Sequence, residues 1–349
     1  MNSHHDQINA SSTATRTPFA WLGRIIPPLL ALVLVGCLWL ASAIAVPVAL
    51  QPWSSRLQGF TTVFLGIFIE ALPFLMAGVL VSSAIHLYVS EDVIQRLSPR
   101  NPFLAAIVGA LIGLAFPVCE CGSIPAARRL LTKGMALPAG IAFTLAAPVI
   151  NPIVLISTYV AFGSWEMVAW RAGLTMVIAV VIAVLMGTPT HVEEVLTTAA
   201  CRPDHDHDHD HDPKANPLSQ ILSHANTEFF EMSRYLVAGG LLAATLQTLV
   251  PQQTITALGN GPVISILVMI ALAAVLSICS TVDAFIALSF VGTFTPGAIM
   301  AFLVFGPMID IKSTLMLTST FRRRTVALII LFCFQLALLT GVLINFYLP

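Results

Sequence analysis

The chain alternates long apolar runs with short polar stretches, and most of the runs are long enough to cross a membrane. A spanning helix needs about 20 predominantly apolar residues, and no alternating pattern of short segments suggests a transmembrane barrel. The long apolar runs cover residues 24–50, 60–89, 136–162, 166–187, 228–250, 262–296, 298–320 and 325–347. The pattern therefore predicts an all-α polytopic membrane protein.

The first apolar run follows a polar segment, residues 1–23, whose Ser, Thr and His content predicts a disordered cytoplasmic N-terminus. We interpret residues 24–50 as an N-terminal transmembrane helix. The stretch "ASAIA" within it also resembles the cleavage site of a signal peptide, so removal of this helix is the alternative. Both interpretations place residues 51–59 outside the cytoplasm, and the topology of the later helices does not depend on the choice.

Composition and charge agree with a membrane location. Hydrophobic residues make up 57% and charged residues 9% of the 349 positions, whereas a soluble domain carries about 25% charged residues. The net charge of −1 does not favour a nucleic-acid partner. The apolar composition makes the lipid bilayer the predicted partner. Basic residues gather in "SEDVIQRLSPRNP", "ARRLLTKGM" and "FRRR", which the positive-inside rule assigns to the cytoplasm. The same rule places the C-terminus on the outer, periplasmic side.

The two halves of the chain carry similar segments in the same order. The matching pairs are "FIEALPFLMAG" (68–78) with "FFEMSRYLVAG" (229–239), "FPVCECGSIPA" (116–126) with "LSICSTVDAFI" (276–286), and "AFTLAAPVINP" (142–152) with "AFLVFGPMIDI" (301–311). They predict two repeats, residues 60–187 and 227–349, joined by a His- and Asp-rich cytoplasmic linker at 188–226. The basic residues give the repeats opposite orientations, and inverted repeats with interrupted helices are typical of secondary transporters.

Each repeat contains a pair of short segments that we expect to form a re-entrant or short-helix hairpin. In the first repeat both ends of the pair lie beside basic residues, which puts "CECG" at 119–122 at the tip. Irregular backbone at membrane depth is tolerated only where protein or a water-filled cavity covers it. The hairpin tips and the Pro-containing breaks "AAPVINP" and "FGPMID" should therefore line one interior site.

These breaks offer soft and anionic ligands. Thiolates one residue apart, Cys119 and Cys121, could both bind one soft ion such as Cu(I), Zn(II) or a trivalent arsenical, and Cys279 would add a third sulfur. The spacing alone identifies neither a zinc knuckle nor a redox dithiol, and the alternative is that both cysteines only pack a tight turn. The predicted substrate-binding residues are Cys119, Glu120, Cys121, Asn151, Cys279, Asp283 and Asp310, with the three cysteines as metal ligands.

Ionisable residues within the apolar helices are candidates for proton coupling. Glu70 and Glu231 occupy equivalent positions in the repeats, and Asp310 lies two residues before Lys312. We expect these four groups to carry the protons that drive transport. The alternative is structural, in which the glutamates bond a neighbouring helix and Asp310 forms a local ion pair with Lys312.

The predicted linker holds the sequence "DHDHDHDHD" at residues 204–212. Four imidazoles alternating with carboxylates are typical of a weak chelator for Zn, Cu, Ni or Co, and the alternative is a solubilising spacer. The metal-ligating candidates in this segment are His205, His207, His209 and His211. We expect no required cofactor, because these ions, or As(III), would be transported or buffered.

The sequence contains no Walker A loop, no dinucleotide-binding glycine motif and no nucleophile elbow. This predicts secondary transport rather than ATP-driven transport or enzymatic activity. Two alternatives stay open. One is a membrane-embedded redox protein that uses Cys119 and Cys121 as a dithiol, and the other is a membrane subunit of a larger metal-handling complex.

The motifs "CECGSIPAARRL" and "GIAFTLAAPVINPIVLIST" resemble those of the bacterial predicted-permease family that includes the organoarsenical efflux permeases and the UPF0718 group. The resemblance covers about residues 60–347. It implies an inner-membrane permease and efflux of a thiol-reactive metal or metalloid such as methylated trivalent arsenicals. The positions that match are Cys119, Cys121, Asn151, Cys279 and Asp283. The His-Asp linker is not part of the family pattern and favours a divalent metal.

Overall fold

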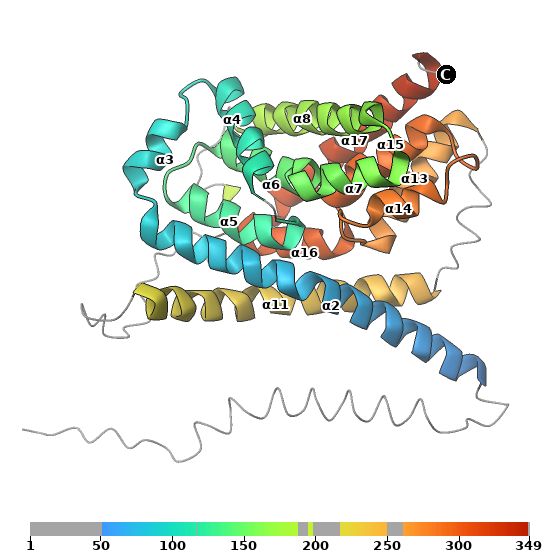
Figure 1. The fold of residues 1–349 in the computed structure, drawn as a ribbon, viewed down its shortest axis with the longest axis horizontal. Coiled ribbons are helices and arrows are strands. Elements are labelled where there is room, and N and C mark those ends of the chain that lie inside the picture. The colour runs from blue at the N-terminus through green and yellow to red at the C-terminus, as the bar shows by residue number, and fades with distance from the viewer. Residues whose placement is uncertain (1–50, 117, 188–194, 198–216, 250–260, 348–349) are drawn as a thin grey trace, which may run out of the picture. The chain divides into compact units, whose positions relative to one another are not determined.

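The computed structural model describes residues 51–116, 118–187, 195–197, 217–249 and 261–347. The predicted N-terminal helix and the His-Asp motif lie outside the described residues and stay predictions. The chain divides into residues 1–58 and 59–349. Only the beginning of the first described helix belongs to the first unit, so the architecture given below is that of the second unit (Figure 1).

The described part of the chain is helical, apart from two isolated β-bridges. Its first half contains α2 (Gln51–Tyr88), α3 (Glu91–Leu97), α4 (Pro102–Ala115), α5 (Glu120–Thr132), α6 (Leu137–Ile150), α7 (Pro152–Phe162) and α8 (Trp165–Gly187). Its second half contains α11 (Pro217–Leu249), α13 (Pro262–Leu276), α14 (Asp283–Leu288), α15 (Pro296–Met308), α16 (Ile311–Thr320) and α17 (Arg323–Tyr347). The prediction of an all-α protein is confirmed.

Five helical stretches among the described residues are long and apolar enough to cross a membrane. They are Ser54–Ile85, Leu137–Phe162, Trp165–Gly187, Pro296–Thr320 and Arg323–Tyr347. The chain is therefore a multi-pass membrane protein, as predicted. The expected span at 228–250 is not among the five, because polar side chains such as Arg234 and Gln247 interrupt that apolar run. The helix that contains it, α11, begins at Pro217, inside the segment that we assigned to the linker.

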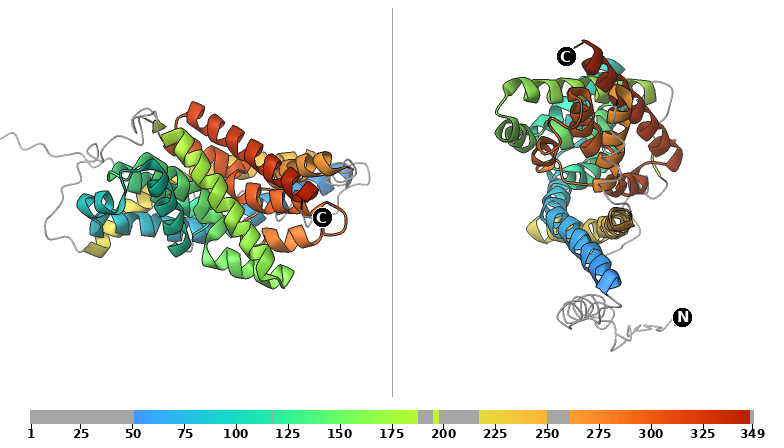
Figure 2. Two further views of the ribbon diagram at one scale, coloured as in Figure 1. Left: turned by 90° about the horizontal axis from the view of Figure 1, so that it is seen from above. Right: turned by 90° about the vertical axis from the view of Figure 1, so that its right-hand side faces the viewer.

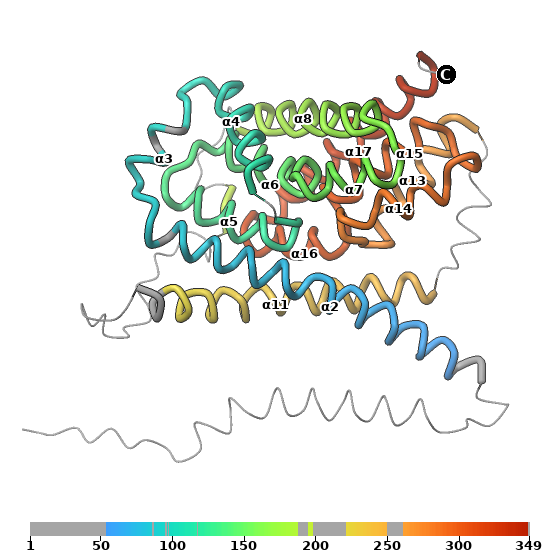
Figure 3. Tube along the Cα trace, in the orientation of Figure 1, coloured from blue at the N-terminus to red at the C-terminus, as the bar shows by residue number. Residues whose placement is uncertain are grey.

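The helices follow one another in a similar order in the two halves, which Figure 3 traces from blue to green and then from yellow to red. In the first half α4 and α8 pack against α6, and in the second half α13 and α17 pack against α15. The halves also interlock, because α5 contacts α16 and α14 contacts α7. This arrangement brings the N-terminal ends of short helices from both halves together. The inverted orientation of the two halves stays a prediction.

The long apolar runs at 137–162 and 296–320 are each broken into two helices by local sequence. Asn151 has extended backbone before Pro152, and its side-chain Oδ1 accepts a hydrogen bond from the Val154 amide at the start of α7. Asp310 is also extended, and it forms a capping box with Ser313 at the start of α16. A residue before proline avoids helical geometry, and Asn and Asp are preferred N-caps. The sequence thus interrupts both runs at equivalent points.

The centre of the bundle is formed by α6, which is buried along its whole length, and by α15, which is buried along nearly all of it. Outside them α8 and α17 contact each other, and Figure 2 shows these two long helices running side by side. Both helices expose large apolar side chains, among them Val177 and Leu331. Apolar surface of this kind suits contact with lipid chains rather than with water.

The helix α2 approaches α5 at a pair of glycines, and this close approach gives a test of the packing. A Cβ atom added at Gly78 would lie 2.1 Å from the Gly122 Cα. We predict that Gly78→Ala lowers the free energy of unfolding by about 1–3 kcal/mol, because backbone has to move apart. The control is Gly66→Ala on the same helix, where an added Cβ meets nothing within 4 Å. Thermal unfolding of both variants in detergent measures the difference, and equal midpoints would contradict the packing.

Candidate functional site

Polar side chains from both halves meet where α5 faces the break between α15 and α16. The first half contributes Cys119, Glu120 and Cys121, and the second contributes Asp310 and Lys312, all of them buried. The chain bends here because Cys119 has extended backbone and serves as N-cap of α5. Its carbonyl accepts hydrogen bonds from the amides of Gly122 and Ser123, which closes the first turn of the helix. The Cys-Glu-Cys motif is therefore held at a helix start.

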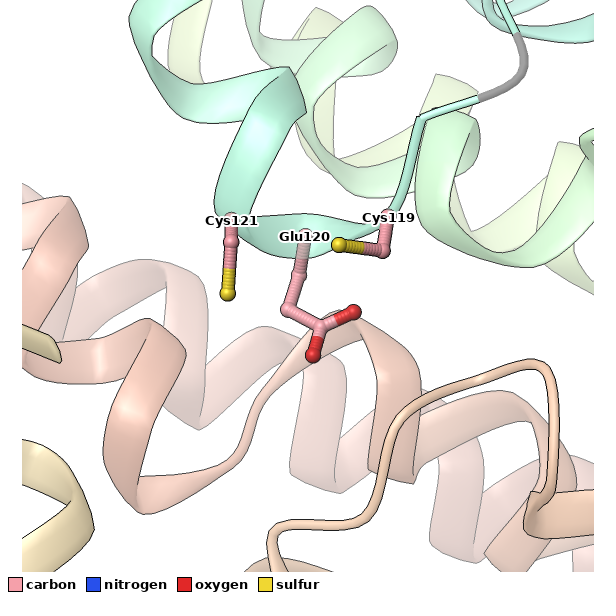
Figure 4. Close-up of side chains that lie close together, drawn as sticks. All are labelled: Cys119, Glu120 and Cys121. Carbon is pink, nitrogen blue, oxygen red and sulfur yellow. The ribbon is translucent and has the colours of Figure 1, made fainter. Parts of the chain in front are cut away.

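The two thiols and the carboxylate of this motif point to one place. One ligand atom from each of Cys119, Glu120 and Cys121 lies within 4.8 Å of the others. Figure 4 shows the three side chains projecting from the start of α5 toward the second-half helices. The Cys119 thiol is also within hydrogen-bonding reach of Cys121 and of Cys279 from the second half. The structure therefore brings together the three cysteines that the sequence analysis selected.

Cys279 is held in the same way as Cys119. Its carbonyl accepts hydrogen bonds from the amides of Val282 and Asp283, three and four residues later, at the start of α14. Two residues before Cys279, the helix α13 ends at Ser277, whose backbone is in the left-handed region with φ of 47°. That left-handed residue ends the helix where glycine is the usual choice. The two carbonyls thus accept the same pair of amide hydrogen bonds, although Cys119 is the N-cap of α5 and Cys279 lies in the turn that precedes α14.

A buried ion pair joins the halves beside the thiols. The Lys312 Nζ lies 2.7 Å from Glu120 Oε1 and 3.8 Å from Asp310 Oδ2, and it donates a hydrogen bond of 3.4 Å to the Ser277 carbonyl. Neither oxygen of the Glu120 carboxylate accepts a well-directed hydrogen bond from the described residues. Lys312 is therefore the counter-ion of Glu120, while the carboxylate keeps lone pairs that could bind a ligand.

Asn151, a predicted binding residue, uses its polar atoms within the protein. Its Nδ2 donates a hydrogen bond of 3.2 Å to the Val118 carbonyl, and its Oδ1 caps α7. These contacts tie the break between α6 and α7 to the residue that precedes Cys119. The role that the geometry supports is positioning of the Cys-Glu-Cys turn. Direct contact of Asn151 with a substrate stays a prediction.

Asp283, a second predicted binding residue, is paired with Arg171 of the first half. The guanidinium donates from Nη1 to Asp283 Oδ1 at 3.0 Å and from Nη2 to Oδ2 at 2.6 Å. Nη1 also donates to the Thr158 hydroxyl at 2.8 Å, and the Arg171 side chain is completely buried. Arg171 is not among the site residues predicted from the sequence. The signal was present, because it is a basic residue inside the apolar run 166–187.

The two glutamates at equivalent repeat positions have different surroundings. Glu231 is engaged by Arg128, whose Nη1 lies 3.0 Å from both carboxylate oxygens. Next to this pair, Arg129 Nε lies 4.0 Å from Oε1 of the buried Glu228. Glu70 is half-buried on α2 and close enough to Lys312 and Glu120 to interact with both electrostatically. Proton coupling by either glutamate stays a prediction, as does metal binding by the histidines outside the described residues.

The helical bundle of the described residues, with a polar centre buried between its halves, is that of a multi-pass membrane protein. The family described as "Predicted permease" matches residues 56–346, which include both halves and every residue of the site. The chain belongs to this predicted-permease family. The family description denotes a transport protein rather than an enzyme.

Relatives with similar sequences include three bacterial proteins. The UPF0718 protein YcgR of Bacillus subtilis is 47% identical over 295 residues, which cover 84% of this chain and 98% of the relative. A Streptococcus mutans protein, named provisionally as a two-component membrane permease complex subunit, is 37% identical over 263 residues, 75% of this chain and 87% of its own. The UPF0718 protein YraQ of Escherichia coli is 25% identical over 191 residues, about half of each chain. No solved structure matches.

The Arg171–Asp283 pair is predicted to hold the halves together. Removing one partner of a buried ion pair leaves an unpaired charge, which typically costs about 3–5 kcal/mol. We expect Arg171→Met to destabilise the protein by that amount, and Arg171→Met with Asp283→Leu to recover most of the loss. Chemical unfolding in detergent measures both. Equal stability of the single and double variants would show that the pair carries no such coupling.

Proposed function

We propose that this protein is a secondary transporter that exports a soft metal ion or a trivalent metalloid across the cell membrane through its cysteine-lined centre. The observation that carries this proposal is the convergence of three buried thiols and a carboxylate, drawn from both halves, at helix breaks. Thiolates prefer soft ions such as Cu(I), Zn(II) and As(III) over hard cations. Helix breaks near the middle of a membrane bundle are where secondary transporters bind their substrates.

Two features support the direction and energy source of this proposal. The positive-inside rule puts the linker with its four histidines in the cytoplasm, where it could gather metal before export. Glu70 and Asp310 are acidic groups in or beside the buried centre, and ionisable residues at such depth are typical of proton relays. We propose that proton entry through these groups is exchanged for the exported ion.

The thiols give the direct test of the proposal. We expect Cys119→Ser together with Cys121→Ser to lower the tolerance of an expressing strain to Zn, Cu, Co, Ni, arsenite or methylarsenite, at least for the transported species. Cellular accumulation of that species should rise, because a hydroxyl is a poor ligand for a soft ion. Growth and accumulation in a deletion strain that carries each variant measure the effect.

The matched control is Cys333→Ser on α17, which changes a buried thiol that is not one of the three thiols of the centre. It should keep tolerance and accumulation close to those of the parent protein. If the double substitution at Cys119 and Cys121 leaves tolerance to every ion in the screen unchanged, thiol-mediated transport is wrong.

A second candidate function is suggested by the Streptococcus relative, whose name places it in a two-component permease complex. In that case this chain would be the membrane subunit and would need a second protein for transport. If this is so, we expect this chain, purified from native membranes, to carry the same second protein at a fixed stoichiometry. Transport of the metal by the purified single chain in liposomes would contradict this alternative.

A further inference from the structure

The buried centre already contains a cation. Glu120 is one of the groups that would bind a soft ion, and the Lys312 ammonium occupies it at 2.7 Å. Both side chains are only 3% exposed, so neither charge is screened by water to the degree found at a surface. A second cation cannot join Glu120 while Lys312 stays in place, because two like charges at such distances repel strongly in a buried site.

Lys312 has other acceptors within reach. Its Nζ lies 3.8 Å from Asp310 Oδ2 and 3.4 Å from the Ser277 carbonyl, both in the second half. Asp310 is itself fixed as the N-cap of α16, so its carboxylate does not follow the ammonium. The lysine side chain has four rotatable bonds, and a small rotation would shorten the contact with Asp310 and lengthen the contact with Glu120. The centre therefore provides a second place for the ammonium.

Two thiols lie beside the same carboxylate. The sulfurs of Cys119 and Cys121 and one Glu120 oxygen lie within 4.8 Å of one another, and Cys279 is close enough to Cys119 for the two thiols to interact. Glu120 has no well-directed hydrogen bond from the described residues, in contrast to Asp283, which two guanidinium nitrogens hold. Glu120 therefore combines nearby sulfur ligands with a counter-ion that can be displaced.

We propose that Lys312 is a tethered counter-cation that occupies Glu120 in the empty site and moves toward Asp310 when a cationic substrate binds to Glu120 and the thiols. This inference rests on the proposed function and narrows its substrate class to soft cations, since a neutral or anionic species would not displace an ammonium. When the ammonium returns to Glu120, it competes with the bound ion and promotes its release. The lysine thus exchanges with the substrate as an intact ammonium group.

The test is equilibrium binding of Cd²⁺ to the purified full chain, read from the ultraviolet charge-transfer band of cadmium–thiolate bonds. This band reports sulfur ligands and not the histidines at 204–212, and every protein compared carries Cys201→Ser so that the thiol beside those histidines gives no band. Removing a resident competitor that occupies the site 90–99% of the time should tighten apparent binding by about 10–100-fold. We therefore expect Lys312→Met to lower the half-saturating Cd²⁺ concentration by about tenfold or more, and Lys312→Arg to leave it near that of the parent protein.

A double-variant comparison separates this role from a structural one. In a Glu120→Gln background there is no carboxylate to compete for, so adding Lys312→Met should bring no further gain. The proposal is overturned if Lys312→Met binds Cd²⁺ no more tightly than the parent protein, or if Lys312→Met tightens binding equally in the Glu120→Gln background. It is also overturned if neither the parent protein nor Lys312→Met produces the cadmium–thiolate band. Gel filtration and thermal unfolding show whether each variant is folded. Where Lys312→Met does not fold, Lys312→Gln, which also lacks the charge but keeps a hydrogen-bonding side chain, takes its place in both comparisons with the same expected gain.

Failure of the cadmium-binding test can be told apart from failure of the metal-tolerance test of the proposed function. A Lys312-dependent cadmium affinity together with unchanged metal tolerance of the cysteine variants would leave the exchange site valid and the export function wrong. If metal tolerance depends on the cysteines but cadmium affinity is unchanged by Lys312→Met, the export function would be supported and the exchange role of Lys312 would be wrong.

Discussion

Polar groups buried at membrane depth must find partners inside the protein, and the rest of this structure depends on that constraint. Each half contains breaks where backbone amides and carbonyls leave the helical pattern, and lipid cannot satisfy them. The chain satisfies them locally, through the Asn151 and Asp310 caps and through the Cys119 and Cys279 carbonyls. Packing of the other half then covers each break. The breaks and the interlocked halves are therefore stable only together.

The same constraint governs the charges. The ion pairs Glu120–Lys312, Arg171–Asp283 and Arg128–Glu231 each join one half to the other. A buried charge without a partner is strongly destabilising, so the pairs fix the register in which the halves meet. Any movement of one half against the other must break or exchange these pairs. A fold of this kind couples the charge state of its centre to the relative position of its halves.

Much of the centre could be read from the sequence because its signals are local. Pro152 and the caps at Asn151 and Asp310 mark the breaks, and the sequence pairs Cys279 with Cys119, whose carbonyls both accept hydrogen bonds from amides three and four residues later. Arg171 was missed because it lies in the uninterrupted helix α8, where no break drew attention to it. Its partner Asp283 is 112 residues away, a pairing that spacing cannot reveal. The contacts of Asn151 with Val118 and of Glu231 with Arg128 depend on packing, which the sequence does not show.

The sequence by itself determined the membrane location, the all-α class and the position of the helix breaks, because apolar length, proline and N-cap chemistry act within a few residues. The tertiary structure decided which charges pair, that Lys312 occupies Glu120, and that sulfurs from both halves meet beside them. These contacts join residues that are far apart in the chain. They form only when the short helices of the two halves pack against each other and exclude lipid, since a buried charge has to be neutralised by whatever group the packing brings to it.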